Sequence, residues 1–350
     1  MRENKIGFGI IGLGMISETH YLALKDQKDC CLIGGFNKNK EKADTWAKNH
    51  GGCKAYYTLE NMLADPEIDA VSIATPSGKH FEPALAAIRA GKHVLIEKPM
   101  EITEEKVQIL IDEAKKNHVH LCGIFQSRFQ DAPRIFKKAV DEGRFGKITL
   151  VDAQFKWYRT QEYYDSGAWR GTWEVDGGGV FMNQGIHAID LLLFILGEDP
   201  VEISAYSATL AHERIEVEDT AAAVMRFPCG AIGMIEGTTG AFPGSLKRVE
   251  ICGSDGQVVL EEDSITKWQF REERPEDEEI RKKFSASTSF GGSNDPKAIS
   301  CIGHIREFAD LADAIKTGRE PFITGEEALR SVHLIRSVYK SAETGAPVKF

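Results

Sequence analysis

The chain has 350 residues, of which 42% are hydrophobic and 27% are charged, a balance typical of globular proteins. At roughly 100–200 residues per domain, this length predicts two domains. The net charge of −10 argues against a nucleic-acid or acidic-membrane partner, because nothing here would neutralise phosphates over a wide face. Seven cysteines without a C-x-x-C pair predict free thiols. With no signal-peptide pattern and no long apolar run, we expect a cytoplasmic protein that does not span a membrane.

In the first third of the chain, short apolar runs alternate with longer stretches of helical spacing. The expected strands are residues 6–11, 31–36, 70–74, 93–96 and 118–124. The expected helices include residues 18–25, 39–50, 80–90 and 104–117. Thr58, before the segment 59–65, and Thr103, before 104–117, are expected N-caps. This alternation predicts βαβ units and a parallel, doubly wound sheet of the Rossmann type over residues 1–125.

Beyond about residue 127 the pattern changes. Residues 148–158, 203–210, 220–227, 231–237, 248–253 and 257–261 have the character of strands separated by turns. One apolar helix, 182–196, interrupts them and ends at Gly197, while 305–316 and 326–341 are expected amphipathic helices. The charged stretch 271–283 is interpreted as a solvated segment. Residues 126–350 are therefore predicted to form a second α/β domain with a mostly antiparallel sheet.

A glycine-rich turn follows the first expected strand, with the pattern G-x-G-x-x-S over residues 12–17. Gly12 permits the tight turn, and Gly14 lets the backbone approach a pyrophosphate. Met15 and Ile16 then open a helix whose N-terminal N–H groups attract phosphates. Ser17 departs from the usual Gly or Ala, but the position at the first strand–helix junction is the required context. The turn predicts a bound dinucleotide.

The end of the second expected strand leaves the choice between NAD and NADP open. An acid is expected there to hold the ribose hydroxyls, but the chain has Asn37, followed by Lys38 and Lys40. Asn37 could bind a hydroxyl without repelling a 2′-phosphate. The lysines could attract such a phosphate, or they could be ordinary loop cations.

Further candidate cofactor contacts lie where two other expected strands end, because ligands bind at the carboxyl ends of parallel strands. Thr75 and Pro76 follow strand 70–74, and His80 lies just beyond them at a helix start, where it could also be a surface or capping residue. Glu97 and Lys98 follow strand 93–96 in the same way.

Four segments together resemble one known family. They read GFGIIGLGMIS from residue 7, IATPSGKH from 73, AGKHVLIEKPMEIT from 90 and GGGVFMNQGIHAIDLL from 177. In this order they are similar to the glucose–fructose oxidoreductase/inositol dehydrogenase/MocA family. The resemblance implies a Rossmann domain followed by an α/β domain with a large open sheet that commonly forms dimers or tetramers. It also implies hydride transfer between nicotinamide C4 and a carbinol carbon of a sugar, glycoside, sugar nucleotide or cyclitol, without a metal.

The same resemblance assigns the chemistry to three residues. Lys98 would hydrogen-bond the reacting hydroxyl and stabilise charge on its oxygen, although it could be a surface lysine paired with Glu97. His187 would be the general base, although a histidine in an apolar helix could be a core residue. Asn183, four residues earlier and expected on the same helix face, replaces an aspartate that is frequent in the family. An amide can orient a hydroxyl but cannot stabilise imidazolium with a charge.

Several other residues are candidate contacts of the substrate or the nicotinamide. Trp169 and Arg170 precede the apolar helix, and the resemblance suggests that they lie near the nicotinamide end or the substrate. A packed tryptophan and a salt-bridged arginine are the alternatives. The remaining candidates for the substrate pocket are Arg128, Tyr158, Tyr163 and Asp176. Asp190 is expected to be structural.

Three functions are compatible with these residues. The first is a dehydrogenase of a sugar-like or polyol substrate, with pyranose C3 as a candidate position because the N-Q-G-x-H variant resembles sugar-nucleotide and glycoside oxidases of the family. The second is a non-catalytic NAD(P)-binding regulator, which Lys98 and His187 argue against. The third is an enzyme whose cofactor stays bound and is recycled by a second substrate.

Overall fold

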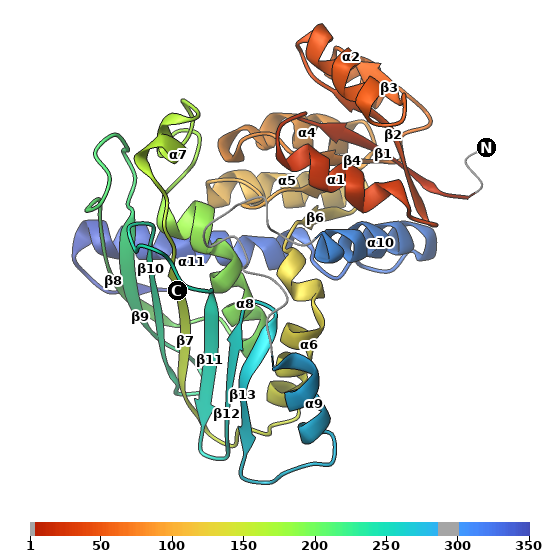
Figure 1. The fold of residues 1–350 in the computed structure, drawn as a ribbon. Coiled ribbons are helices and arrows are strands. Elements are labelled where there is room, and N and C mark those ends of the chain that lie inside the picture. Colours follow the sequence, from red (N-terminus) through yellow and green to blue (C-terminus); the bar gives the residue numbers. More distant parts are fainter. Residues whose placement is uncertain (1–3, 286–300) are drawn as a thin grey trace. The chain divides into compact units, whose positions relative to one another are not determined.

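The computed structural model describes residues 4–285 and 301–350, and it divides the chain into two compact units (Figure 1). Residues 1–3 of the predicted first domain and 286–300 of the predicted second domain lie outside the described residues. Unit 1 comprises Met1–Gln126 and Cys301–Val332, and unit 2 comprises Ser127–Ser300 and His333–Phe350. The first boundary falls next to the predicted one, but the sequence had placed 301–332 with the second domain.

Unit 1 contains a six-stranded sheet in the order β3-β2-β1-β4-β5-β6, with every neighbouring pair parallel. Its strands are β1 (Ile6–Ile11), β2 (Cys30–Phe36), β3 (Lys54–Tyr56), β4 (Ala70–Ile73), β5 (His93–Ile96) and β6 (Leu121–Gly123). The predicted doubly wound sheet is confirmed. Only β3 was not predicted, because its three residues, Lys54–Tyr56, form no run of apolar side chains.

The helices of unit 1 begin where local capping chemistry places them. They are α1 (Ile16–Lys25), α2 (Lys40–Asn49), α3 (Leu59–Leu63), the short η1 (Ser77–Lys79), α4 (Phe81–Arg89), α5 (Glu104–Lys116) and α10 (Ile302–Thr317). The side chain of Thr58 accepts a hydrogen bond from the Asn61 N–H at 3.2 Å, and that of Thr103 from the Lys106 N–H at 3.4 Å. Both predicted N-caps are therefore confirmed.

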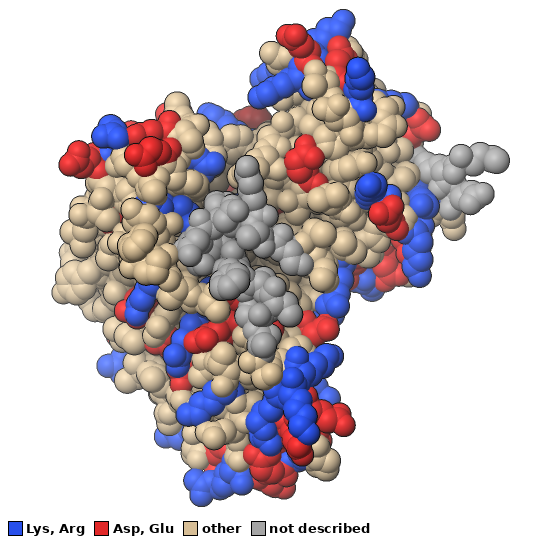
Figure 2. Space-filling view, in the orientation of Figure 1, with Lys and Arg blue, Asp and Glu red and all other residues tan. Residues whose placement is uncertain are grey.

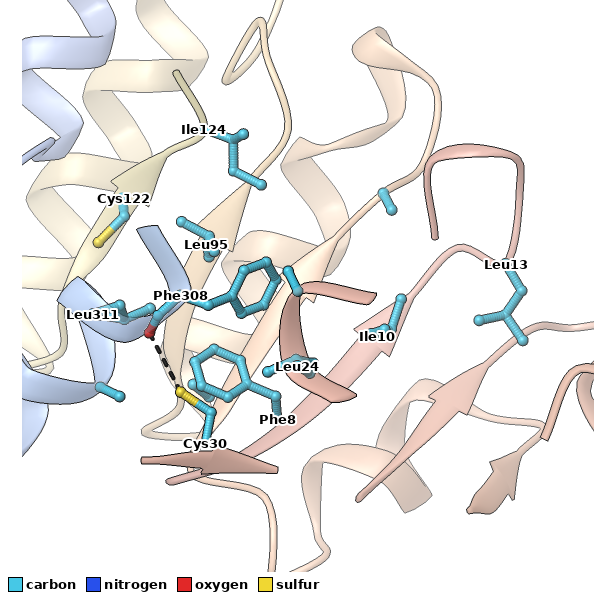
Figure 3. Close-up of a cluster of buried hydrophobic side chains, with 14 of the residues drawn as sticks. Phe8, Ile10, Leu13, Leu24, Cys30, Leu95, Cys122, Ile124, Phe308 and Leu311 are labelled. Carbon is cyan, nitrogen blue, oxygen red and sulfur yellow. Dashed lines mark hydrogen bonds between the residues drawn. The ribbon is translucent and has the colours of Figure 1, made fainter. Parts of the chain in front are cut away.

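Helix α10 belongs to unit 1 because its apolar face completes that unit's core (Figure 3). The Phe308 ring meets the Phe8 ring edge to face, with centroids 5.1 Å apart, and Leu311 is buried in the same cluster. The Cys30 thiol donates to the Phe308 carbonyl, with sulfur and oxygen 3.5 Å apart. The sequence showed an amphipathic helix here but not which core it would cover.

Unit 2 contains an eight-stranded sheet in the order β13-β12-β11-β7-β10-β9-β8-β14. The strands are β7 (Ile148–Lys156), β8 (Glu202–Ala208), β9 (Thr220–Arg226), β10 (Ile232–Thr238), β11 (Arg248–Gly253), β12 (Gly256–Glu261), β13 (Ser264–Phe270) and β14 (Val348–Lys349). The pairing is antiparallel except between β7 and β10, so the mostly antiparallel sheet is confirmed. Strands β13 and β14 were not predicted.

The helices of unit 2 include the one that the candidate site needs. They are the short η2 (Gln126–Phe129), which begins at the last residue of unit 1, α6 (Asp131–Asp141), α7 (Gln161–Asp165), η3 (Val180–Gly185), α8 (Ile186–Leu196), α9 (Asp277–Phe284) and the end of α11 (Gly325–Thr344), which begins in unit 1. Helix α8 packs on β7 and β11, which fixes it against the sheet.

Two details of unit 2 correct the sequence analysis. The charged stretch 271–283 is not only a solvated segment, because Asp277 in α9 accepts hydrogen bonds from buried Trp268 at 2.6 Å and from Arg144 at 2.7 Å. The expected helix 182–196 begins earlier, at Val180, and its first six residues are π-helical. Among the described helices of both units, none is long and apolar enough to cross a membrane.

Candidate active site

The glycine-rich turn of unit 1 has the shape that a dinucleotide requires. Gly12 has φ of 95°, and a Cβ there would stand 2.8 Å from the Ala74 carbonyl, so a larger residue would force the two strand ends apart. Gly14 is exposed, and a Cβ there would meet nothing within 4 Å. The turn is thus tight on the protein side and open on the other side, which fits a pyrophosphate.

Ser17 explains how the chain tolerates its departure from the glycine pattern. Its hydroxyl is fully buried, donates to the Gly14 carbonyl at 2.6 Å and accepts from the Trp46 indole at 3.2 Å. The serine therefore braces the turn from inside. Helix α1 begins directly after Met15, so its N-terminal N–H groups are placed to attract phosphate.

The loop after β2 holds the residues on which cofactor choice depends. The Asn37 side chain accepts from the Asn39 N–H at 2.9 Å, which fixes the amide at the strand end. The Lys40 ammonium lies 5.2 Å from the centre of the Tyr57 ring, and Lys38 is exposed. Lys38 is consequently the cation with more freedom to meet a phosphate.

His80 has a different environment from the one that the sequence suggested. Its ring is buried, with Nδ1 at 2.9 Å from the Pro99 carbonyl and Nε2 at 2.8 Å from the Thr75 carbonyl. The ring therefore ties the loop after β4 to the loop after β5. Thr75 and Pro76 are half-buried on that loop, and the Thr75 hydroxyl donates to the Lys79 carbonyl at 3.0 Å.

The Glu97 side chain points into a buried polar network. Its Oε1 lies 2.9 Å from His20 Nε2, whose ring Nδ1 lies 2.8 Å from the Ser72 hydroxyl. His304 Nε2 approaches the same oxygen at 3.7 Å. The other oxygen, Oε2, accepts the backbone N–H of Lys98 at 3.1 Å. Half-buried Lys98 is thus held through its backbone by a carboxylate that sequence reasoning had considered as a cofactor contact or as an ion-pair partner of the lysine.

The charge states in this network follow from burial and bonding. Burial raises the pKa of Glu97, but hydrogen bonds from His20 and His304 outweigh it and hold that pKa well below its ordinary value. Burial lowers the pKa of His20, against the raising effect of Glu97. A neutral His20 then donates from Nε2 to the carboxylate and accepts from Ser72 at Nδ1.

The same three side chains are the one group among the described residues whose donor atoms suit a metal ion. The ligand atoms of His20, Glu97 and His304 lie within 4.8 Å of one another. However, the His20 ring and the Glu97 carboxylate already satisfy each other and Ser72 through hydrogen bonds. These hydrogen bonds support the strand ends that carry Ser72 and Glu97.

In unit 2, Asn183 is oriented by a buried aspartate. Its Nδ2 donates to Asp176 Oδ1 at 2.5 Å, and Asp176 Oδ2 accepts the Gly171 N–H at 2.9 Å. The amide carbonyl is therefore directed away from Asp176. His187 lies half-buried in the first turn of α8. The sequence analysis assumed that Asn183 and His187 are four residues apart in a regular α-helix. Because η3 is π-helical, their spacing is not that of a regular α-helix.

A second cluster of unit 2 joins two arginines around Tyr163. The Tyr163 hydroxyl accepts from Arg170 at 2.7 Å and from Gln184 Nε2 at 3.0 Å, while Gln184 Oε1 accepts from Arg159 at 3.2 Å. The guanidinium groups of Arg159 and Arg170 lie 5.4 and 4.4 Å from the Tyr163 ring centre. Burial lowers the pKa of Arg159, and the nearby positive charge of Arg170 lowers it further. Trp169 stacks at 4.6 Å from Arg170.

Two of the predicted substrate contacts, Arg128 and Tyr158, interact with other side chains of the protein. Arg128 is 1% exposed and forms a bidentate pair with Asp190, at 2.8 and 2.7 Å. The structural role expected for Asp190 thus includes Arg128, which has no exposed surface to offer a substrate. Tyr158 is half-buried, and its ring lies 5.2 Å from that of Phe242.

Sequence reasoning did not select Arg159 or Gln184. Gln184 stands inside the N-Q-G-I-H motif, so its position was a usable signal. Arg159 carries no local pattern, because its partner Gln184 is distant in the chain.

Comparisons with known proteins agree with this architecture. Residues 6–124 match the oxidoreductase family with an NAD-binding Rossmann fold, and residues 134–259 match the GFO/IDH/MocA C-terminal domain. The chain is 28% identical to myo-inositol 2-dehydrogenase of Thermotoga maritima, over 97% of both chains.

Two solved structures are also similar. The WlbA dehydrogenase of Bordetella pertussis is 33% identical over 99% of both chains, with a TM-score of 0.85. That of Chromobacterium violaceum is 33% identical over 100% of this chain and 97% of its own, with a TM-score of 0.88. Both were solved in complex with NADH and UDP-GlcNAcA. This chain belongs to the GFO/IDH/MocA family and is an NAD(P)-dependent oxidoreductase.

Proposed function

We propose that this enzyme oxidises a ring hydroxyl of a nucleotide-linked acidic sugar of the UDP-GlcNAcA type, with C3 as the carbon oxidised. The similarity to two WlbA dehydrogenases that bind UDP-GlcNAcA supports this substrate class. Myo-inositol 2-dehydrogenase, at 28% identity, is the relative that supports a cyclitol instead.

The observation that carries the acidic sugar is the pair of arginines around Tyr163. Their contacts with Gln184 and with the Tyr163 hydroxyl are to neutral groups. Two guanidinium groups near one aromatic ring repel each other, and an anion would relieve that repulsion. Half-buried Arg170 is the one that a carboxylate could reach, since Arg159 is only 4% exposed. A neutral cyclitol could not form such a charge-assisted hydrogen bond with Arg170.

In the proposed oxidation, a hydride leaves the carbinol carbon and a proton leaves its hydroxyl, and each residue is assigned a role in one of these transfers. Bound NAD would supply the acceptor for the hydride of the carbinol carbon. We assign His187 as the base that takes the hydroxyl proton and Lys98 as the donor that stabilises the negative charge developing on the oxygen. Asn183, oriented by Asp176, is assigned to hold a substrate hydroxyl. Trp169, Tyr163 and Asp176 are assigned to the walls and supports of the substrate pocket, whereas Arg128 is left out.

The cofactor contacts are proposed as Gly12, Gly14, Met15, Ile16, Asn37, Thr75, Pro76 and Glu97, with Lys98 at the nicotinamide end. We propose NAD rather than NADP, because the two similar WlbA structures hold NADH. A direct comparison of the two dissociation constants tests this choice. If NADP bound more tightly, exposed Lys38 would be the residue to examine first.

The oligomer and the location are also proposals. One face of the unit 2 sheet carries exposed apolar residues, which supports a homodimer or homotetramer formed through it. All seven cysteines are free thiols, which supports a reducing, cytoplasmic compartment.

The deciding experiment measures NADH formation with four substrates: UDP-GlcNAcA, its neutral counterpart UDP-GlcNAc, free glucuronic acid and myo-inositol. We expect kcat/KM for UDP-GlcNAcA to exceed that for UDP-GlcNAc by about tenfold or more, as one charge-assisted hydrogen bond provides. Equal rates for the two nucleotide sugars would remove the acidic-sugar proposal. Turnover of inositol alone would replace it with the cyclitol. Reduction of the product with borodeuteride, followed by NMR, identifies the carbon.

The same assay separates catalysis from the alternatives. A non-catalytic regulator would bind NAD but form no NADH with any substrate in a broad panel of sugars and inositols. An enzyme that recycles a retained cofactor would leave purification with dinucleotide bound and would need a second, oxidising substrate for multiple turnovers.

A further inference from the structure

Glu218 forms a buried clamp on the segment that leads into the candidate base. The side chain lies just before β9 and is 3% exposed. Its Oε2 accepts the Gly179 N–H at 2.9 Å, and its Oε1 accepts the Phe181 N–H at 3.0 Å. The backbone carbonyl of Glu218 accepts the Val180 N–H between them at 3.0 Å. One residue therefore binds three consecutive N–H groups where the π-helical turn begins.

The clamp depends on two further residues. Tyr339, from α11, donates its hydroxyl to Glu218 Oε1 at 2.8 Å, and the same hydroxyl accepts the Met182 N–H at 3.3 Å. Gly179 lies so close to the Glu218 carbonyl that a Cβ would overlap it. The next link reaches the site, because the Asn183 N–H donates to the Gly179 carbonyl at 3.0 Å.

We propose that Glu218 is a positioning residue for the proposed oxidation: with Tyr339, its carboxylate holds the turn over residues 179–183 in the π-helical form that presents Asn183 and starts the helix of His187. The kinetic part of this inference rests on the proposed function. The carboxylate touches no reacting atom in this role. It acts by fixing backbone N–H groups that otherwise have no helical partner at the start of a helix.

The ionised form of Glu218 is the one that the geometry suits. The Gly179 and Phe181 N–H groups only donate, and a protonated carboxyl would bring a further donor to the same place. Burial raises the pKa of Glu218 to about 7, against hydrogen bonds from Phe181, Gly179 and Tyr339 that lower it. The clamp consequently weakens as the pH falls below neutrality.

Other titratable groups near the clamp do not replace Glu218. Burial raises the pKa of Tyr339 well above its ordinary value, so the phenol stays a donor. The charge of Asp176 contributes to the raised pKa of Tyr339. The Asp176 carboxylate accepts hydrogen bonds from the Asn183 side chain and from the Gly171 N–H. Asp219, next in the chain, uses its carboxylate on the N–H groups of Leu210, Ala211 and His212.

The first test compares Glu218→Gln with Glu216→Gln. Glu216 is exposed and accepts one N–H, that of Trp173, which a glutamine can still do. In Glu218→Gln, the amide NH₂ must face an N–H donor. We expect kcat to fall by on the order of a hundredfold, as displacement of a positioned group does, while the NAD dissociation constant and the values for Glu216→Gln stay close to wild type. Unchanged kcat in a folded Glu218→Gln would overturn the proposal.

The second test needs no turnover, so it stands even if the proposed substrate is wrong. The side-chain amide signal of Asn183 is followed by NMR as the pH varies, alongside the infrared band of the protonated Glu218 carboxyl. We expect one midpoint for both signals, near the raised pKa, and the same midpoint in a His187→Ala background. Tyr339→Phe removes a donor to the carboxylate and should move both midpoints to higher pH. An Asn183 signal that ignores the ionisation of Glu218 would refute the coupling.

Discussion

Lys98 and His187 are held by different means, although the proposal gives both a part in one proton and hydride transfer. Lys98 follows a buried parallel strand, and its backbone N–H is bound by the carboxylate of its neighbour Glu97. His187 stands in the first turn of a helix whose preceding turn is π-helical. The position of Lys98 is therefore determined within a few residues, whereas that of His187 depends on a turn that Glu218 and Tyr339 hold from elsewhere in unit 2.

At the scale of single residues, Lys98→Ala and His187→Ala are expected to lower kcat by about 10²–10⁴-fold, the range of general acid–base catalysis. The NAD dissociation constant should change little, because the glycine turn and α1 remain. Steady-state kinetics and cofactor titration measure both effects. Exposed Lys79→Ala, on the loop after β4, is the matched control. Near-wild-type turnover in either variant would remove that residue from the mechanism.

Arg170→Gln tests the charge recognition separately from the chemistry. We expect kcat/KM for UDP-GlcNAcA to fall by about 10–100-fold, the value of a charge-assisted hydrogen bond, with a smaller effect on UDP-GlcNAc. The control is Arg214→Gln, since Arg214 is an exposed arginine paired with Asp165. Equal losses for the acidic and the neutral sugar would mean that Arg170 supports Tyr163 without recognising a carboxylate.

At the scale of elements, the network Ser72–His20–Glu97 joins helix α1 to strands β4 and β5. His20→Ala would leave a buried carboxylate and a buried hydroxyl with one partner fewer. We expect the free energy of unfolding to fall by about 1–3 kcal/mol, as removing a buried hydrogen bond to a charged group does. Urea denaturation measures this loss, and Thr19→Ala on the same helix is the control. A loss no larger than that of the control would show that the network is not a major support.

The same network predicts how stability depends on pH. The folded-state pKa of Glu97 is lowered, as is that of His20, so both groups stabilise the fold at neutral pH, and this contribution is lost as the pH falls. Because the ordinary pKa of Glu97 is 4.5, the urea midpoints at pH 5 and pH 3 should differ more in the wild type than in Glu97→Gln. An equal difference in the two proteins would place the acid sensitivity elsewhere.

At the scale of the whole molecule, acidic and basic side chains are mixed over the visible surface (Figure 2). A contrasting feature is the uncovered face of the unit 2 sheet. Leu150, Val224 and Ile232 lie on that face, because the strand register sets Ile232 beside Leu150 and Val224 beside Met234. Val224 and Ile232 are each about half exposed. A second copy of the chain would remove this apolar surface from water.

Light scattering coupled to gel filtration should therefore give the mass of a dimer or a tetramer. A Val224→Glu and Ile232→Glu double variant should reduce that mass, since each charge would be placed in the paired face. Leu22→Glu, on exposed α1, makes the same chemical change outside the sheet and serves as the control. A monomeric wild type, or a double variant of unchanged mass, would contradict assembly through this face.

The sequence by itself determined those features that neighbouring residues encode. Strand and helix periods, the caps at Thr58 and Thr103, the glycine turn and the E-K-P and N-Q-G-I-H motifs each lie within a short segment. Their physical causes are local sterics, hydrogen bonds to nearby N–H groups and alternation of apolar side chains. From these, the parallel sheet of unit 1 could be predicted, whereas the candidate chemistry at Lys98 and His187 came from the family that the motifs resemble.

The tertiary structure decided every feature that needs a partner from a distant segment. It packed α10 against the core of unit 1, paired Arg128 with Asp190 in an ion pair, and placed Arg159 where it donates a hydrogen bond to Gln184. It also set Glu218 against the π-helical turn that precedes His187. Such pairings leave no local pattern, because one carboxylate or arginine is chemically equivalent to many others until the fold selects which donors and acceptors are buried together.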